Sequence, residues 1–61
     1  MILETYEIQI EREDVSTAHL YWEAVETFIH RADAINALET YLSEDLDSSY
    51  RLMVYRNVWD R

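Results

Sequence analysis

Two histidines and two glutamates are spaced so that a helix would bring them to one face. His19, Glu23, Glu26 and His30 follow one another at intervals of four, three and four residues, and two imidazoles with two carboxylates are a donor set that zinc accepts. On a strand, His19 and Glu23 would share one side and His30 would leave it. Because a row of polar residues on a helix is usually a solvated face, we predict no metal site and no cofactor.

The residue types used in hydrolytic catalysis are present but not arranged for it. The four serines lie in or beside predicted loops, and the absence of glycine excludes a Gly-built nucleophile elbow or phosphate loop. Adjacent carboxylates, such as Glu13 with Asp14 and Glu44 with Asp45, point in different directions. A chain of 61 residues also has little volume for a substrate pocket of about 300 Å³. We therefore predict that the protein is not an enzyme.

Charge is the strongest compositional feature. Thirteen acidic residues face five arginines and no lysine, which gives a formal net charge of −8. Such a field repels nucleic acid and anionic membranes and attracts basic protein surfaces, although acidity also serves solubility alone. The chain has no cysteine, no leader-like N-terminal segment and no apolar run near the ~20 residues of a membrane span. We expect a cytoplasmic protein.

Three segments have clear periodicity. Residues 31–46 have apolar side chains at helical spacing, with polar side chains on the other side. The helical stripe is Ala34, Ala37, Leu38, Tyr41 and Leu42, and the polar side is Asp33, Asn36, Glu39, Thr40 and Ser43. Residues 5–12 alternate with Tyr6, Ile8 and Ile10 on one face, and residues 50–55 alternate with Tyr50, Leu52 and Val54, so both segments are predicted strands.

The segment 15–29 has two interpretations. As a helix it would join the next segment in one element from about Ser16 to Asp45, but the buried stripe would then change face midway. As a strand, residues 20–28 are rich in Tyr, Trp, Val, Thr and Phe, and residues 13–17 form a hairpin loop. A thirty-residue helix is far above the ~12-residue mean, so the strand is favoured.

These elements predict an α+β fold of one domain over residues 1–61, with the order ββαβ. The sheet is antiparallel and three-stranded, the first strand is central, and one helix packs on one face. The side chains expected to face the helix are Tyr6, Ile8, Ile10, Trp22, Leu52 and Val54.

The opposite sheet face has nothing left to cover it, and it is the predicted partner-binding surface. Its carboxylates, tyrosines and methionine suit a basic partner that accepts aromatic side chains. The expected residues are Glu7, Gln9, Glu11, Tyr21, Glu23, Arg51, Met53 and Tyr55. A secondary acidic cluster, formed by Glu39, Glu44, Asp45 and Asp47, would add carboxylates at spacings that resemble phosphates.

The arrangement of residues resembles a class of small proteins. A Tyr-rich first strand, Trp22-x-x-Val25-x-x-Phe28, Ala34 early in a helix and Tyr50-Arg51-Leu52 opening a last strand are similar to small ββαβ proteins of phages and bacterial mobile elements. His30 stands where that pattern has a Ser, Thr or Asp helix cap. With the acidic composition, the chain is similar to phage anti-CRISPR proteins and other DNA-mimic inhibitors.

That resemblance implies a cytoplasmic inhibitor in a bacterial host, which binds a basic nucleic-acid-handling protein and neither nucleic acid nor membrane directly. The alternative is a homodimeric structural or accessory module, which buries its spare sheet face or joins edge strands. Val58 and Trp59 have no obvious place in the predicted elements, so they could complete the core, cover a dimer partner or dock a target. An antitoxin or transcription-factor antagonist would likewise use an acidic surface to bind a basic target.

Overall fold

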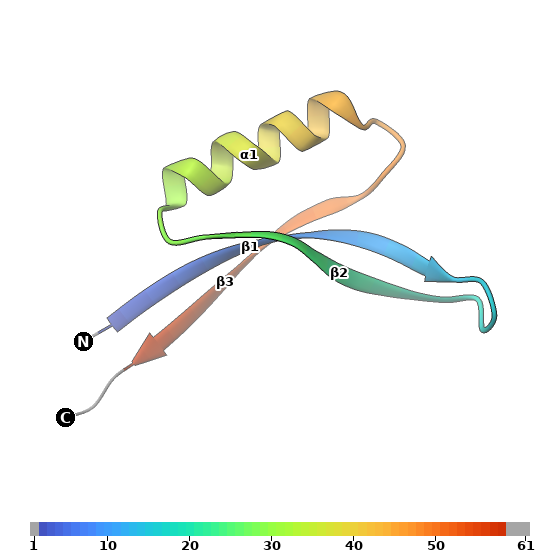
Figure 1. Ribbon diagram of the computed structural model, residues 1–61, viewed down its shortest axis with the longest axis horizontal. Coiled ribbons are helices and arrows are strands. Elements are labelled where there is room, and N and C mark those ends of the chain that lie inside the picture. Colours follow the sequence, from blue (N-terminus) through green and yellow to red (C-terminus); the bar gives the residue numbers. More distant parts are fainter. Residues whose placement is uncertain (1, 59–61) are drawn as a thin grey trace.

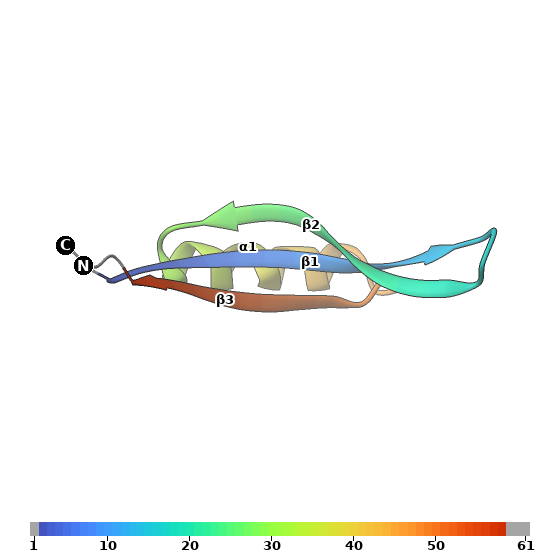
Figure 2. The same ribbon diagram turned by 90° about the horizontal axis from the view of Figure 1, so that it is seen from below.

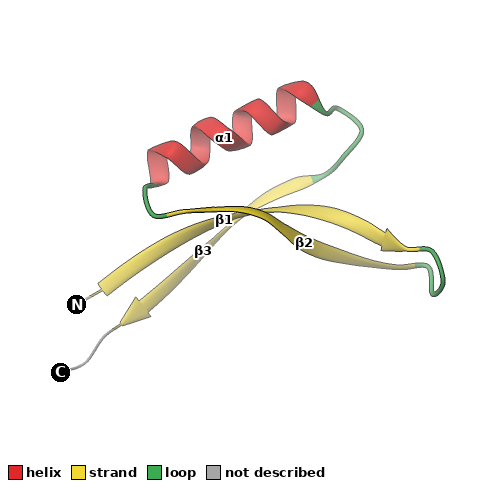
Figure 3. Cartoon of the chain, viewed as in Figure 1, coloured by secondary structure: helices red, strands yellow, loops and turns green. Residues whose placement is uncertain are grey.

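The computed structural model describes residues 2–58, which form one sheet and one helix (Figures 1 and 3). The elements are β1 (Ile2–Asp14), β2 (His19–Phe28), α1 (Arg31–Glu44) and β3 (Tyr50–Val58). The sheet order is β2-β1-β3, and β1 pairs antiparallel with both neighbours. The α+β prediction with a central first strand is confirmed, and residues 19–28 form a strand rather than an extension of the helix.

The two faces of the sheet follow from the register. Residues paired across antiparallel strands share a face, so Ile8 lies beside Leu52 and Glu26 on the side that carries α1. Gln9 lies beside Arg51 and Ala24 on the other side, which we call the open face. The open face consists of Leu3, Thr5, Glu7, Gln9, Glu11, Glu13, Leu20, Trp22, Ala24, Thr27, Arg51, Met53, Tyr55 and Asn57.

A β-bulge in β2 changes which side chains lie under the helix. Ile8 pairs with Glu26 and Gln9 pairs with Ala24, so Val25 is an extra residue on β2. From Ala24 back to His19, the bulge exchanges the two faces of β2 relative to the predicted alternation. The faces predicted for Tyr21, Trp22 and Glu23 were therefore wrong. Trp22 lies on the open face opposite Glu11, whereas Tyr21 and Glu23 lie on the helix side opposite Arg12 and Ile10.

The core is small and lies where α1 crosses β1. Ile8, Ile10 and Ala34 are the buried apolar residues among residues 3–57. Ala34 has no exposed surface, and its small side chain lets the backbone of the helix approach the sheet closely. Ala37, Leu38 and Tyr41 are half-buried. Leu42, predicted for the same stripe, is exposed.

The helix begins and ends without strong capping. His30 is the N-cap residue and makes no side-chain hydrogen bond to the helix, as its residue type predicts, while Asp33 places a carboxylate in the first turn. The helix ends at Glu44, two residues before the predicted end, because Asp45 is extended. Within residues 2–58, α1 at 14 residues falls short of the length and apolar character that a bilayer crossing demands.

The molecule is a thin slab with a projecting arm. Its extents are 45 × 28 × 10 Å, and the shortest matches the width of three strands. β3 pairs with β1 only as far as Ile10, so the remainder of β1 and the start of β2 project past the helix as a two-stranded arm (Figures 1 and 2). The strands therefore run further than predicted, and Glu13 belongs to β1 rather than to the loop.

The turn at the tip of the arm places a non-glycine residue in the left-handed region. Ala18 has φ 60°, and its N–H donates to the Asp14 carbonyl at 2.7 Å. The Asp14 carboxylate accepts hydrogen bonds from the hydroxyl and the N–H of Ser16, which hold the pKa of Asp14 below its ordinary value. The turn is thus formed by local hydrogen bonds in a chain without glycine.

Ala18→Gly should stabilise the domain, because glycine adopts positive φ without the steric cost that Cβ imposes. We expect a gain of about 1 kcal/mol, seen as a melting temperature raised by roughly 4–8 °C. The matched control is Ala32→Gly at an exposed helical position, which should lower stability by about 1 kcal/mol. A melting temperature that falls for both variants would contradict a strained turn.

Candidate protein-binding surface

Gln9 is the centre of a hydrogen-bonded network on the open face. Its side-chain nitrogen donates to Glu7 Oε1 at 2.6 Å and to the Tyr55 hydroxyl at 3.3 Å, and its oxygen accepts from Arg51 Nε at 2.6 Å. The Tyr55 hydroxyl also lies 3.5 Å from Glu7 Oε1. Gln9 is only 7% exposed although no element of residues 2–58 covers this face. The neighbouring side chains themselves bury it.

An aromatic side chain extends the network onto β2. The Arg51 Cζ atom lies 4.2 Å from the ring centroid of Trp22, a cation–π contact. Trp22 was predicted to face the helix, so the sequence reasoning missed it as a surface residue. Strict alternation would place Trp22 and Phe28, which are six residues apart, on one face, and only the bulge at Val25 separates them. The sequence carries no signal that marks Trp22 as an open-face residue.

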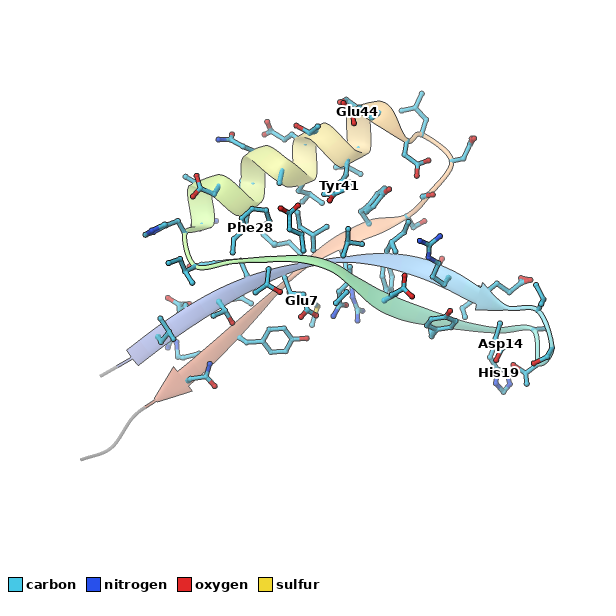
Figure 4. The ribbon with its side chains drawn as sticks, in the orientation of Figure 1. Glu7, Asp14, His19, Phe28, Tyr41 and Glu44 are labelled. Carbon is cyan, nitrogen blue, oxygen red and sulfur yellow. The ribbon has the colours of Figure 1, made fainter. Side chains whose placement is uncertain are left out.

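The predicted binding residues are therefore partly brought together. Glu7, Gln9, Arg51, Met53 and Tyr55 are neighbours in the register, and Glu11 follows on the same face. Figure 4 shows Glu7 pointing away from the helix. Tyr21 and Glu23 do not join them, and Glu23 instead pairs with Arg12 at 3.3 Å. That these residues bind a partner remains a prediction.

The open face also carries a row of carboxylates along β1. Glu7, Glu11 and Glu13 occupy alternate positions of the strand, with Gln9 between the first two. Neighbouring positions on one side of a strand are about 6.8 Å apart. Glu13 is exposed and was not among the predicted site residues, because the strand was predicted to end at residue 12.

The secondary acidic cluster is divided by its contacts. Glu39, Glu44 and Asp47 are exposed, and Figure 4 shows Glu44 on the outer side of the helix. Asp45 is half-buried, and its Oδ2 accepts a hydrogen bond from the Tyr50 hydroxyl at 2.9 Å. Hydrogen bonds from the hydroxyls of Ser48 and Tyr50 hold the pKa of Asp45 below its ordinary value. Asp45 thus fastens the loop after the helix.

A pair of tyrosines links this loop to the sheet. Tyr41 and Tyr50 stack with ring centroids 5.2 Å apart, and the Tyr41 hydroxyl donates to Glu26 Oε1 at 3.1 Å. That hydrogen bond raises the pKa of Tyr41, while burial and the Asp45 carboxylate raise the pKa of Tyr50. Figure 4 shows Tyr41 between the helix and the sheet. Glu26 is exposed, and its carboxylate ties the helix to β2 through this hydrogen bond.

Asp45→Asn should lower the melting temperature at neutral pH, because the ionised carboxylate of Asp45 is more stable in the folded state than in the unfolded state. A depressed folded pKa means that this stability is present above the ordinary value of 3.8 and is lost as the pH falls through the folded pKa. The difference between wild type and Asp45→Asn should therefore shrink in acid. The control is Asp47→Asn, which makes the same change in net charge at an exposed position. If both variants lowered the melting temperature equally at neutral pH, Asp45 would not be what stabilises the loop after the helix.

Within residues 2–58 there is no pocket, and no group of three or more His, Asp or Glu side chains is placed to hold a metal ion. Two ion pairs involve arginine in that part of the chain, Arg12 with Glu23 and Arg56 with Glu4 at 3.6 Å. The side chain of Val58 and the whole of Trp59, for which a role in the core, in a dimer or in docking a target was predicted, lie outside the part of the chain that the structure describes. Comparison of the chain with protein-family models, with curated proteins and with solved structures finds no match in any of the three.

Proposed function

We propose that the protein is a non-enzymatic inhibitor, which binds a basic nucleic-acid-handling protein of a bacterial host through its open face. The observation that carries this proposal is the ordered network around Gln9 on a face that no described element covers. A surface already held in one arrangement loses little conformational entropy when a partner binds.

The residue types of the open face suit protein recognition. Trp22, Arg51 and Tyr55 belong to the three residue types that most often dominate binding energy, and here one contact and two hydrogen bonds link them through Gln9. The half-buried Met53 adds an adaptable apolar side chain on the same face. These side chains supply anchors for a partner surface.

Charge supplies the preference for a basic partner. In the row of Glu7, Glu11 and Glu13, the backbone positions lie about 13.6 Å and about 6.8 Å apart along β1. The slab is 45 Å long, more than the ~34 Å of one turn of B-DNA. The formal net charge of −8 would accelerate encounter with a basic protein and repel nucleic acid itself. The resemblance to phage anti-CRISPR and DNA-mimic proteins favours an effector of host defence as the target.

The experiment that tests the proposal is capture from a nuclease-treated bacterial lysate on the immobilised full chain, with washes at low and high salt. We expect a basic nucleic-acid-binding protein that leaves as salt rises. The purified target should then lose its binding to labelled DNA or RNA as the chain is added. A captured protein whose nucleic-acid binding is unaffected would contradict the inhibitory function.

Charge reversal on the open face should weaken this binding. The variant Glu11→Lys with Glu13→Lys changes two carboxylates of the row, of which Glu13 is exposed and Glu11 is half-buried. The matched control, Glu39→Lys with Glu44→Lys, makes the same change of net charge on the exposed side of α1. We expect loss of at least tenfold in affinity for the first variant and a small effect for the second. Equal losses would mean that only net charge matters.

A further inference from the structure

The outer edge of β3 is a regular, unpaired strand edge. β3 pairs with β1 on one side without interruption from Ile2↔Val58 to Ile10↔Tyr50, and the sheet order leaves its other side open. An open edge offers backbone N–H and C=O groups to another strand. The outer edge of β2 is different, because the bulge at Val25 interrupts it and Glu23 and Glu26 lie along it. β3 has no bulge, and its two charged side chains, Arg51 and Arg56, are engaged by Gln9 and Glu4 of β1.

Charge also sets β3 apart from the other elements. β1, β2 and α1 all contain carboxylates, whereas Tyr50–Val58 contains none and carries Arg51 and Arg56. Two copies of a chain with net charge −8 repel one another over most of their surface. The β3 edge is the place where they can meet without opposing carboxylates.

Apolar surface is exposed along the same edge. Val54 is 51% exposed on the helix side of β3, and its neighbour Tyr55 is exposed on the open face. Val54 is also the middle residue of the nine in β3. An exposed, carboxylate-free strand of this kind is a site for pairing with another strand of high β propensity.

The size of the exposed surface fits a second copy. The accessible area is 4917 Å², whereas a folded monomer of 7.4 kDa exposes about 4,200 Å². The radius of gyration is 14.0 Å, against roughly 10.5 Å for a compact domain of this length. The excess area is roughly 700 Å², and it is shared between the projecting arm and the outer edge of β3. A stable complex buries about 800 Å² on each partner.

We propose that two copies of the chain pair through their β3 strands, antiparallel about a twofold axis near Val54. The result is a six-stranded sheet in the order β2-β1-β3-β3-β1-β2, with both helices on one side and both open faces joined on the other. Met53 then lies opposite Tyr55 of the second copy, a favourable sulfur–aromatic pairing. This inference does not rest on the proposed function, because it concerns the free protein alone.

Sedimentation of the purified full chain over a wide concentration range tests the pairing. We expect a species of twice the 7.4 kDa monomer mass. Val54→Lys should raise the dimer Kd roughly a hundredfold, because it brings two like charges together at the axis. Val25→Lys is the matched control, since Val25 is 40% exposed on the opposite edge strand, and it should leave the mass unchanged.

Residue-level hydrogen exchange of the wild-type chain gives a second test that does not depend on how a variant folds. Amide protons on the outer edge of β3 should become more protected as the protein concentration rises, while those of β2 should not. A monomer at millimolar concentration would overturn the proposal. So would a dimer that Val25→Lys dissociates and Val54→Lys leaves intact, or protection that rises only on β2. Failure to capture a basic partner would leave this result untouched.

Discussion

Ile8→Ala is expected to leave the domain largely unfolded at room temperature. Ile8 has no exposed surface, and it lies on the central strand under α1 with Leu52 and Glu26 beside it. Removing a buried isoleucine to alanine costs about 2–5 kcal/mol. A core of a chain this short supplies about 3–5 kcal/mol in total, so the loss is comparable with the whole stability. Urea unfolding followed by circular dichroism measures the effect.

Leu46→Ala provides the control for that experiment. Leu46 is 86% exposed in the loop after the helix, and its truncation should change the free energy of unfolding by no more than ~0.5 kcal/mol. If Ile8→Ala and Leu46→Ala shifted the unfolding midpoint equally, the core would not lie where α1 crosses β1. The same comparison applied to Ile10 would locate the end of the core.

Gln9→Ala is expected to lower the free energy of unfolding by about 1–3 kcal/mol, although Gln9 lies on the face away from the helix. The truncation removes the groups that Arg51, Glu7 and Tyr55 contact, and those three side chains become free to move. The indole N–H resonance of Trp22 should shift as well, because Arg51 is no longer held over the ring. Denaturant unfolding and NMR together measure both results.

A double-mutant cycle separates the network from simple loss of burial. Gln9→Ala and Arg51→Ala should show a coupling energy of about 0.5–3 kcal/mol, since Arg51 Nε donates to Gln9 Oε1. Thr27→Ala is the control, at an exposed open-face position beside Glu7, and it should couple weakly to Arg51→Ala. Strictly additive effects of Gln9→Ala and Arg51→Ala would contradict an ordered network.

β1, β3 and the helix could be predicted because each has one unbroken periodicity, and β2 was predicted from its content of Tyr, Trp, Val, Thr and Phe. Alternation of Tyr6, Ile8 and Ile10 places one face of β1 under the helix, and helical spacing places Ala34 against it. The ends were less accurate, since β1 continues to Asp14 and α1 stops at Glu44. Strand ends depend on pairing with a neighbour, and here the pairing of His19 with Asp14 extends both strands of the arm.

The open face could be predicted on two strands and not on the third. β1 and β3 keep strict alternation, so Glu7, Gln9, Arg51, Met53 and Tyr55 were placed correctly. The bulge at Val25 depends on how β2 pairs with β1, and a period of two has no place for an extra residue. The network around Gln9 was beyond sequence reasoning, because it requires side chains from three strands to meet.

An NMR titration of the isotope-labelled full chain with an arginine-rich peptide tests whether the open face binds a basic surface. The peptide stands in for the basic surface of the partner, so the result does not depend on knowing the target. We predict that shifts concentrate on Glu7, Glu11, Glu13 and the Trp22 indole, and that they diminish with salt. Shifts confined to Glu39, Glu44 and the outer side of α1 would show that the open face is not the binding surface.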